Sequence, residues 1–298
     1  MALAALLSAM KEIILSCPVM PEEEEQRRLY LKDNFPKLSS EEVEDLSKIS
    51  PKKFQIYSNS IFSGERNLIK RNFPMTIAAL ANLKPDRYSK DSDLTKLLKD
   101  LHKQHPWQST QTVELGKNFV AYIKGLPRDL ISKAPYLAEL AEFELQLRIV
   151  RRTPDDEIMP ADSLSEKELS SMTVEAVLGL KYLIPSFVIF AEFDYDVPAA
   201  RQYFTSNKRI LPESIGKKFT CSAISRNAEG LPRWRELNRE IYRLLQAKER
   251  KKPHNISEIV ETLLSTEGQL KDEIQLFKSF MDLLSKLIAS GVVVVIAD

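Results

Sequence analysis

The chain has 298 residues, with 43 Lys or Arg against 42 Asp or Glu, so its net charge is only +1 at pH 7. This balance excludes a strongly basic nucleic-acid coat and an acidic tail protein, but it allows a local basic patch. Eight glycines are few, which disfavours Gly-rich phosphate loops and favours helices. Two cysteines and three histidines make a closed zinc site of Cys and His improbable.

The first apolar segment, Leu3–Leu15, looks like a signal peptide but lacks its other features. It has no basic start, and Lys11 and Glu12 interrupt it, while its apolar residues recur at helical spacing. No stretch has the roughly 20 apolar residues that a membrane-spanning helix needs. Cys17 and Cys221 give no sign of a disulfide framework. We therefore expect a soluble cytoplasmic protein.

The first half of the chain is predicted to be an all-helical bundle. Apolar residues recur at intervals of three and four, and the breaks fall at Pro or at capping residues. Ser39 and the glutamates after it open one helix, and Pro74 ends or kinks another. Further helices are predicted over residues 51–83, 91–102, 113–123 and 135–150.

The middle and second half of the chain differ in character. Residues 152–172 are rich in Pro, Ser and acidic residues, which indicates a linker between a domain over 1–151 and a second over 173–298. In the second domain we expect strands at 187–193 and 219–225, a turn at 227–230, helices at 232–249, 256–264 and 270–288, and a strand at 292–296.

This order of strands, three helices and a strand is typical of a winged helix-turn-helix domain. The expected fold class is therefore mainly α (α+β), with an N-terminal helical bundle and a C-terminal winged-helix-like domain that has a small sheet. Because the analogy is one of fold alone, it leaves the function open.

No arrangement of residues in the sequence indicates catalysis. The chain has no Gly-x-Ser-x-Gly, no Cys–His motif and no P-loop. Cys221 lies in a β-rich run, where a small buried thiol is the default. His102 and His105 are a weak metal signal, and we expect both on the surface at a helix end. We therefore expect no enzyme activity and no metal or cofactor in this chain.

Positive charge is concentrated between Lys217 and His254, where eleven Lys or Arg face four Glu. Such a patch would suit phosphates. Helix-turn-helix proteins, however, read bases with the second helix of the motif, and here the helix over 270–288 carries Asp272, Glu273 and Asp282. An acidic peptide or protein partner therefore fits better than duplex DNA. A winged-helix transcriptional regulator and a merely solvated helix face are the alternatives.

Short motifs in a fixed order add a family resemblance. Between residues 50 and 150 they resemble Tyr-x-Asn-Asn … Leu … Phe-Pro, His-Pro-x-x-Ser, Gly-x-x-Phe and Pro-Tyr-Leu-x-x-Leu-Ala, and the second half resembles Pro-Ser … Tyr-Pro-Val … Trp. The matching residues are Ile56–Ser60, Leu68, Phe73–Pro74, His105–Ser109, Gly116–Phe119, Ala134–Ala141, Ile184–Ser186, Tyr195–Val197 and Tyr203–Phe204. Ser60 and Asp196 depart from the pattern. Together these motifs resemble the partner-protein family of methanobactin and bufferin biosynthesis (MbnC, BufC and HvfC types).

The resemblance implies a non-catalytic subunit. Such proteins pair with a multi-iron TIM-barrel enzyme that modifies cysteine in a ribosomally made precursor peptide, and they hold the leader of that peptide. The expected partners are therefore this enzyme, in a heterodimer, and a Cys-containing precursor peptide, with any iron in the enzyme. Neither a membrane nor nucleic acid is an expected partner.

We expect the second domain to capture the leader as an added strand at an exposed sheet edge, at Phe219–Ser225 or at Val292–Ile296. Basic residues beside the edge would steer an acidic leader. The candidate peptide-binding residues are Lys217, Lys218, Phe219, Cys221, Ala223, Ser225, Arg226, Arg233 and Arg235. The candidate enzyme-interface residues are Tyr57, Asn59, Arg66, His105 and Trp107, with Phe73 also considered. For Tyr57 and Phe73, burial in the core is the stronger expectation.

Overall fold

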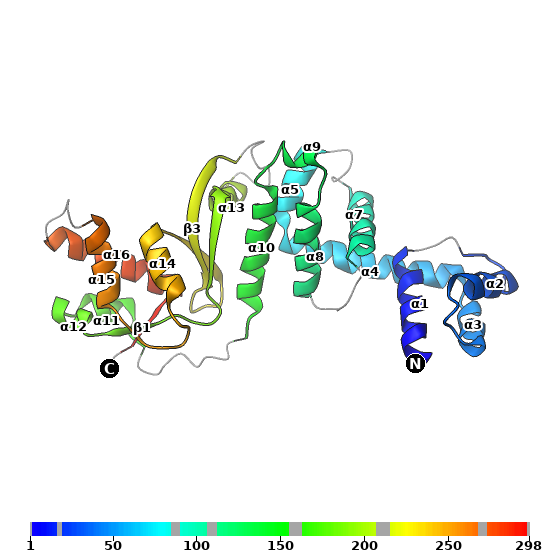
Figure 1. Ribbon diagram of the computed structural model, residues 1–298, viewed down its shortest axis with the longest axis horizontal. Coiled ribbons are helices and arrows are strands. Elements are labelled where there is room, and N and C mark those ends of the chain that lie inside the picture. The colour runs from blue at the N-terminus through cyan, green and yellow to red at the C-terminus, as the bar shows by residue number, and fades with distance from the viewer. Residues whose placement is uncertain are drawn as a thin grey trace. The chain divides into compact units, whose positions relative to one another are not determined.

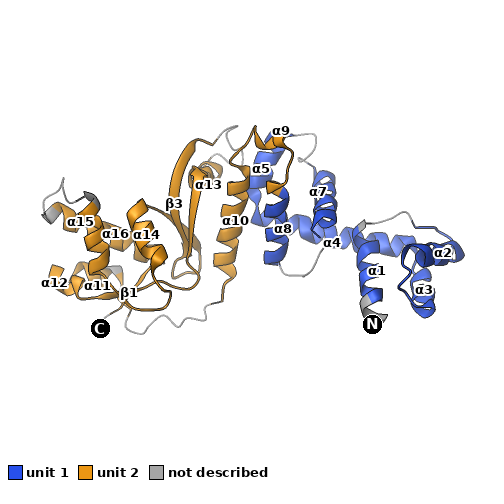
Figure 2. Ribbon diagram, in the orientation of Figure 1, with its two compact units in different colours: residues 1–122 blue, residues 123–298 orange. Residues whose placement is uncertain are grey.

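A computed structural model of the chain describes residues 2–16, 20–84, 90–105, 112–154, 163–206, 215–267 and 273–296. These residues are mostly helical and include two three-stranded antiparallel sheets, which confirms the mainly α (α+β) class (Figure 1). The contacts between residues divide the chain into two compact units, Met1–Tyr122 and Ile123–Asp298 (Figure 2). None of the described helices combines the length and the apolar character needed to cross a membrane.

The first unit begins with three helices around a small apolar core. The third of them starts at a capping box, in which Ser39 Oγ accepts a hydrogen bond from Glu42 N and Glu42 Oε2 accepts one from Ser39 N. The helices are α1 (Ala2–Ser16), α2 (Glu24–Asn34) and α3 (Ser40–Ser47). Their buried core consists of Ile13, Met20, Leu31, Val43, Leu46 and Phe54.

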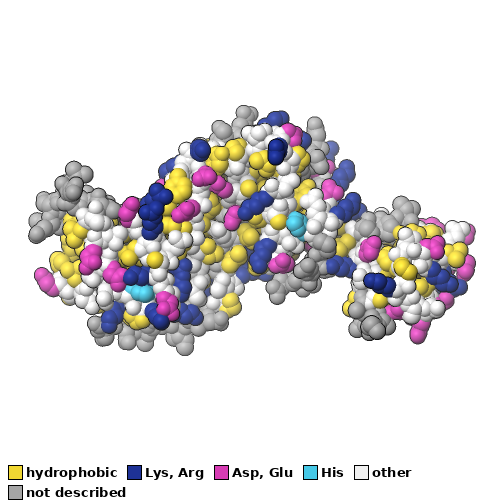
Figure 3. All heavy atoms as spheres, in the orientation of Figure 1, with side chains coloured by type: hydrophobic (Ala, Val, Ile, Leu, Met, Phe, Trp, Pro, Cys, Tyr) yellow, Lys and Arg dark blue, Asp and Glu magenta, His cyan; other side chains and the backbone are white. Residues whose placement is uncertain are grey.

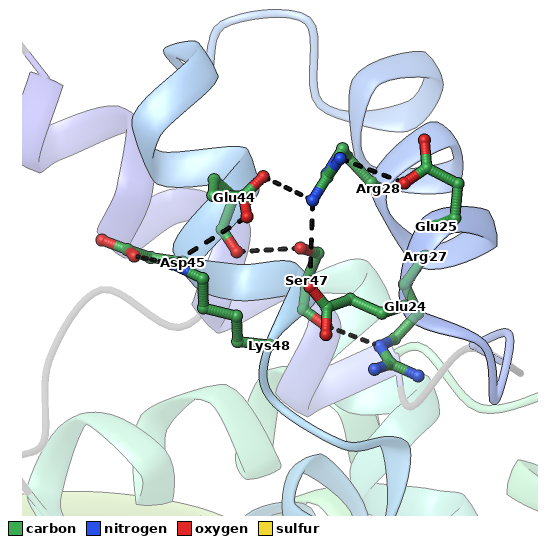
Figure 4. Close-up of polar contacts among 8 residues, drawn as sticks. All are labelled: Glu24, Glu25, Arg27, Arg28, Glu44, Asp45, Ser47 and Lys48. Carbon is green, nitrogen blue, oxygen red and sulfur yellow. Dashed lines mark hydrogen bonds and ion pairs between the residues drawn. The ribbon is translucent and has the colours of Figure 1, made fainter.

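A buried arginine holds α2 and α3 together (Figure 4). Arg27 Nε donates to Ser47 O at 2.9 Å, and its Nη1 donates to Pro21 O at 2.9 Å and to Glu22 O. The neighbouring Arg28 instead lies at the surface, where it pairs with Glu44 and with two glutamates of its own helix. The same pair of helices therefore carries one buried and one solvent-screened cation.

The rest of the first unit is built on the long helix α4 (Pro51–Asn72). Pro51 occupies its first turn, where no N–H is needed, and Pro74 starts the next helix, α5 (Pro74–Leu83), as expected. Helix α7 (Asp91–Gln104) packs along α4. Helix α8 (Thr112–Lys124) contributes Phe119, whose ring lies 4.6 Å from that of Phe73 between their centroids.

The second unit contains a sheet in the order β2-β3-β4 between two helices. Helix α10 covers one face through Phe143, which contacts Phe193, and α14 covers the other through Tyr242, which contacts Phe190. The strands are β2 (Ile189–Tyr195), β3 (Lys217–Arg226) and β4 (Pro232–Leu237). The helices of this unit that precede or flank the sheet are α9 (Arg128–Ile131), α10 (Leu137–Arg152), α13 (Val197–Ser206) and α14 (Arg239–Ala247).

Because α10 packs on this sheet, the division between the compact units falls at residue 122, whereas the expected domain boundary was at residue 151. The expected linker over 152–172 contains the whole of helix α11 (Glu166–Ser170), and its residues 155–162 lie outside the described part of the chain. The domain assignment itself stays a prediction.

The second sheet of this unit has the order β5-β1-β6, with Tyr182 of the central strand fully buried. The strands are β1 (Lys181–Leu183), β5 (His254–Asn255) and β6 (Val294–Ile296), and the accompanying helices are α12 (Val174–Leu178), α15 (Ser257–Glu267) and α16 (Glu273–Ala289). Elements α14, β5, α15, α16 and β6 give the order helix, strand, two helices and strand. The expected order had three helices followed by a strand, and it did not include the short strand β5 between α14 and α15. The third strand, β1, comes from earlier in the chain and lies between the other two.

The predicted helix over 232–249 is wrong in its first part, because Pro232–Leu237 is strand β4 and helix α14 begins only at Arg239. A hairpin turn at 227–230, in which Gly230 has φ +72°, brings β4 back beside β3. Asn238 then caps α14 by accepting a hydrogen bond from Ile241 N at 2.8 Å.

Candidate functional site

The strand that was expected to be an open edge is the centre of its sheet. Cys221 pairs with Glu192 of β2 on one side and with Leu237 of β4 on the other. Strand β4 pairs with β3 from Cys221 to Arg226, and β2 pairs with it as far as Ile224, so both sides of β3 are paired along Cys221–Ile224 and a further strand cannot be added there. The expectation failed because β4 was taken for part of a helix, which removed one neighbour of β3 from the prediction.

Three of the candidate peptide-binding residues are buried on the α14 side of β3. Cys221 and Ala223 belong to the apolar core of the second unit, and the Ser225 hydroxyl donates to Ser290 O. Burial is the main cause that raises the pKa of the Cys221 thiol, so the sulfur stays protonated and unreactive at neutral pH. These three residues stabilise the unit and are not accessible to a peptide.

Arg226 is also buried, at the end of β3. Its guanidinium donates to Val150 O, Thr153 O and Pro154 O, which are carbonyls at the C-terminal end of α10, and it stacks 4.3 Å from the centre of the Phe187 ring. A cation at this position satisfies carbonyls that a helix end leaves without partners. Arg226 therefore fixes α10 to the sheet.

Lys218 lies on the α10 side of the sheet, opposite to its neighbours. It pairs with Glu236 at 3.0 Å and with Asp196 at 3.8 Å, and the hydrogen bond to Glu236 is the main cause that raises its pKa. Its charge is therefore already compensated at the protein surface.

The remaining candidates gather on the α14 side. In the register of the sheet, Arg235 pairs with Ala223 and Arg233 with Ser225, so both arginines point to the face that carries Phe219. Phe219 has 48% of its surface exposed, and the Arg239 guanidinium of α14 lies 5.6 Å from its ring centre. We call Lys217, Phe219, Arg233, Arg235, Arg239 and Arg243 the basic surface.

The five cations of the basic surface have no carboxylate partner among the described residues, in contrast to Lys218, Lys248 and Lys252 of the same unit. Arg235 in addition buries its Nε without a hydrogen-bond acceptor. In Figure 3, Lys and Arg side chains gather beside exposed hydrophobic side chains over β3 and α14. Cations that are left unpaired together attract an anionic partner.

The basic surface borders an open sheet edge. β4 is the outer strand of its sheet, and in the described part of the chain no strand pairs with its free side. At the opposite edge, two main-chain N–H groups of β2, those of Asp194 and Tyr195, donate to Glu139 Oε2 at 2.9 and 3.2 Å. One edge of the sheet is thus partly capped from within, while no strand among the described residues covers the outer side of β4.

Sequence reasoning did not select Arg239 and Arg243 as site residues. Both were counted in the charged segment, but the predicted helix over 232–249 separated them from the sheet. The signal that would have placed them is Asn238, a capping residue that starts α14 directly after β4.

The other expected edge, at Val292–Ile296, is found at β6. β6 is an outer strand of the β5-β1-β6 sheet, as expected, but residues of the chain itself lie along it, since Ser163 forms a β-bridge with Ile296.

The candidate enzyme-interface residues lie in the first unit. Tyr57 is 57% exposed and Asn59 is exposed on α4, so the expectation that Tyr57 belongs to the core is wrong, whereas Phe73 is buried as expected. Arg66 donates to Thr95 Oγ1 at 2.9 Å, and His105 ends α7. Trp107 lies outside the described residues.

The expectation that His102 lies at the surface is also wrong. Its Nε2 is 2.8 Å from Glu65 Oε2, and both side chains are buried between α7 and α4. Within the described ranges, no three or more His, Cys, Asp or Glu side chains are grouped so that they could hold a metal ion.

The sequence matches no family model, and a search of curated proteins finds none that matches it.

Proposed function

We propose that this chain is a non-catalytic recognition subunit whose second unit binds an extended acidic peptide along β4. The observation that carries the proposal is the basic surface, with its five unpaired cations and the exposed Phe219 ring beside the free edge of β4. In the family that the sequence resembles, the corresponding peptide is the leader of a ribosomally made precursor.

The geometry gives each group a role in binding. Main-chain N–H and C=O groups of β4 would pair with an added strand, whose backbone would lie about 4.8 Å away. Alternate side chains of that strand would face Arg233 and Arg235 on the α14 side, where carboxylates would be favoured. Arg239 and Arg243 would extend the attraction beyond the strand and would accelerate encounter with the peptide.

The first unit would then contact the modifying enzyme. Tyr57 and Asn59 offer an exposed aromatic ring and an amide on α4, side-chain types that suit a protein interface. In this proposal the iron and the chemistry at cysteine belong to the partner enzyme, and the complex works in the cytoplasm. This chain would hold the leader so that the cysteine is presented to the enzyme.

A DNA-binding regulator is the competing function, because the order of α14, β5, α15, α16 and β6 is that of a winged helix domain. The position of the charges favours the peptide. The unpaired Arg239 and Arg243 lie on α14, whereas on α16, which would enter the groove, Lys286 is paired with Asp282.

Charged side chains on an edge strand also prevent unwanted pairing between copies of a protein. A purely protective edge binds no peptide, so a binding experiment separates this role from recognition.

The test is co-purification of the chain with an iron enzyme encoded beside it, with and without the neighbouring Cys-containing peptide, followed by size exclusion. The proposal expects a stable complex that retains the peptide and that loses it in the R239E/R243E variant. A matched control is R128E/K133E, which makes the same change of charge at exposed positions on and just after α9. A monomer that ignores both partners and instead shifts duplex DNA would overturn the proposal.

A further inference from the structure

The outer edge of β6 is covered by a short segment of the chain itself. Ser163 forms an antiparallel bridge with Ile296, and Leu164 N donates to Val295 O at 2.9 Å. On its other side β6 pairs with β1. Residues 163 and 164 thus act as a fourth strand of the β5-β1-β6 sheet, which shows that the β6 edge accepts an extended segment.

Among the described residues, the firm anchor of this segment is at its C-terminal side. Ser165 begins α11 with a capping box, in which Glu168 Oε2 accepts from Ser165 N at 2.7 Å and Ser165 Oγ accepts from Glu168 N at 3.3 Å. Leu169 of α11 is buried in the core, and α11 packs on α16. The strand contact itself is much smaller, because it consists of the bridge, one described main-chain hydrogen bond and the half-buried Leu164 side chain.

A cavity of about 390 Å³ lies directly beside the segment. This volume falls in the range of roughly 300–1,000 Å³ that is usual for ligand sites. Leu164 is in its wall and does not fill it. The other lining residues are mostly apolar and include Pro185, Phe187, Ile288, Val293 and Val294. The polar members are Arg226, Asn227 and the two serines of the segment.

The combination of a sheet edge and a pocket is the arrangement by which proteins bind extended peptides. Main-chain hydrogen bonds along the edge give affinity, and a pocket for one side chain gives selectivity. A segment whose only task is to cover the edge would gain by filling the adjoining apolar space, since unfilled space costs packing energy. The segment over 163–165 leaves that space open.

We propose that Ser163–Ser165 is a displaceable strap over a strand-accepting groove, which consists of the β6 edge and this cavity. When the strap leaves, the groove takes an extended peptide that inserts a large apolar side chain into the cavity. This groove is separate from the basic surface on the β2-β3-β4 sheet, so the inference does not rest on the proposed function.

The test uses the chain's own sequence as the probe, in the form of a labelled synthetic peptide of residues 160–168. L164P removes the N–H that bonds to Val295 O and so opens the groove, whereas L164A keeps that N–H. Fluorescence anisotropy is recorded in 0.5 M salt, where attraction of the acidic peptide to the basic surface is screened. The R239E/R243E substitutions are added to the L164P chain as a control for the basic surface. Unchanged binding by this combined variant would show that the basic surface contributes nothing to the signal.

We expect the L164P chain to bind this peptide at least tenfold more tightly than the wild-type chain, with L164A close to the wild type. The same peptide with Leu164→Asp should bind at least tenfold more weakly to the L164P chain, because a charged side chain cannot replace the packing of Leu164 against the apolar core. If L164P does not fold, L164G serves as the opening variant, since it loosens the strap and removes its side chain.

Equal binding by wild-type and opened chains, or a folded opened chain that does not bind the peptide, would overturn the inference. Loss of binding in the added R239E/R243E variant would assign the signal to the basic surface and would equally overturn the strap. A failure of the strap leaves the proposed function intact, because the latter is tested with a different peptide, surface and set of variants.

Discussion

Two glycines with the same backbone conformation allow the packing of the second unit to be tested against a built-in control. Gly291 and Gly230 both have φ +72°, a conformation that costs an L-residue about 1–2 kcal/mol. Gly230 has open space around an added Cβ, whereas a Cβ at Gly291 would overlap Arg226 O and lie 2.9 Å from the Arg226 carbonyl carbon. Only a substitution at Gly291 therefore forces two backbone segments apart.

Gly291 occupies this position because it ends α16. Its N–H donates to Ile288 O at 2.8 Å and the next N–H, that of Val292, donates to Leu287 O at 2.9 Å, which is the hydrogen-bond pattern of a Schellman motif. The close approach to Arg226 joins the end of α16 to the end of β3. Overpacking of this kind typically adds about 1–3 kcal/mol to the conformational cost.

We therefore expect G230A to destabilise the second unit by about 1–2 kcal/mol and G291A by about 2–5 kcal/mol. The assay is urea denaturation followed by Trp234 fluorescence, in a W107F background so that Trp234 is the sole emitter. A loss of stability for G291A that is within about 0.5 kcal/mol of that for G230A would refute the steric part of the reasoning.

Three further predictions concern buried and surface charges. R27M should destabilise the α2–α3 pair by about 2–4 kcal/mol because it leaves buried carbonyls without donors. R28M should cost less than about 1 kcal/mol because Arg28 lies at the surface. Equal losses of stability for R27M and R28M in urea denaturation would contradict this difference. E65L should destabilise the first unit by about 3–5 kcal/mol because it leaves His102 buried without its carboxylate, and an unchanged denaturation midpoint would oppose this account. Hydrogen bonds from the Ser165 side chain and backbone hold the pKa of Glu168 below its usual value, so the Glu168 carboxylate stabilises α11 at neutral pH. This stabilisation is lost as the pH falls below about 4, and hydrogen exchange of the α11 amides measures the loss. Protection of these amides that is constant from pH 6 to pH 3 would be inconsistent with the capping box.

The helical part of the fold could be predicted because its signals are local. Pro74 separates α4 from α5, and the Ser39–Glu42 capping box starts α3, as their positions in the sequence indicate. Strand β4 was missed because Pro232–Leu237 is followed directly by an amphipathic helix. A proline and alternating charged residues fit the first turns of a helix as well as they fit an edge strand.

The parts of the site that sequence reasoning missed depend on contacts between residues far apart in the chain. His102 is buried because Glu65, 37 positions earlier, supplies a carboxylate beside it. Arg226 is buried because α10 ends beside β3 with unsatisfied carbonyls. The concentration of charge after Lys217 was visible in the sequence, but its division between paired and unpaired cations depends on the strand register.

The measurement that tests the central claim most directly is the binding of a labelled twelve-residue peptide of alternating Glu and Val to the full chain, at salt concentrations from 50 to 500 mM. Our account predicts that it binds and that its affinity falls at least tenfold over this range. It also predicts at least a tenfold loss for R239E/R243E and little change for R128E/K133E. Absence of binding, equal affinity for the matching Lys and Val peptide, or an R239E/R243E variant that binds like the wild type would contradict the account.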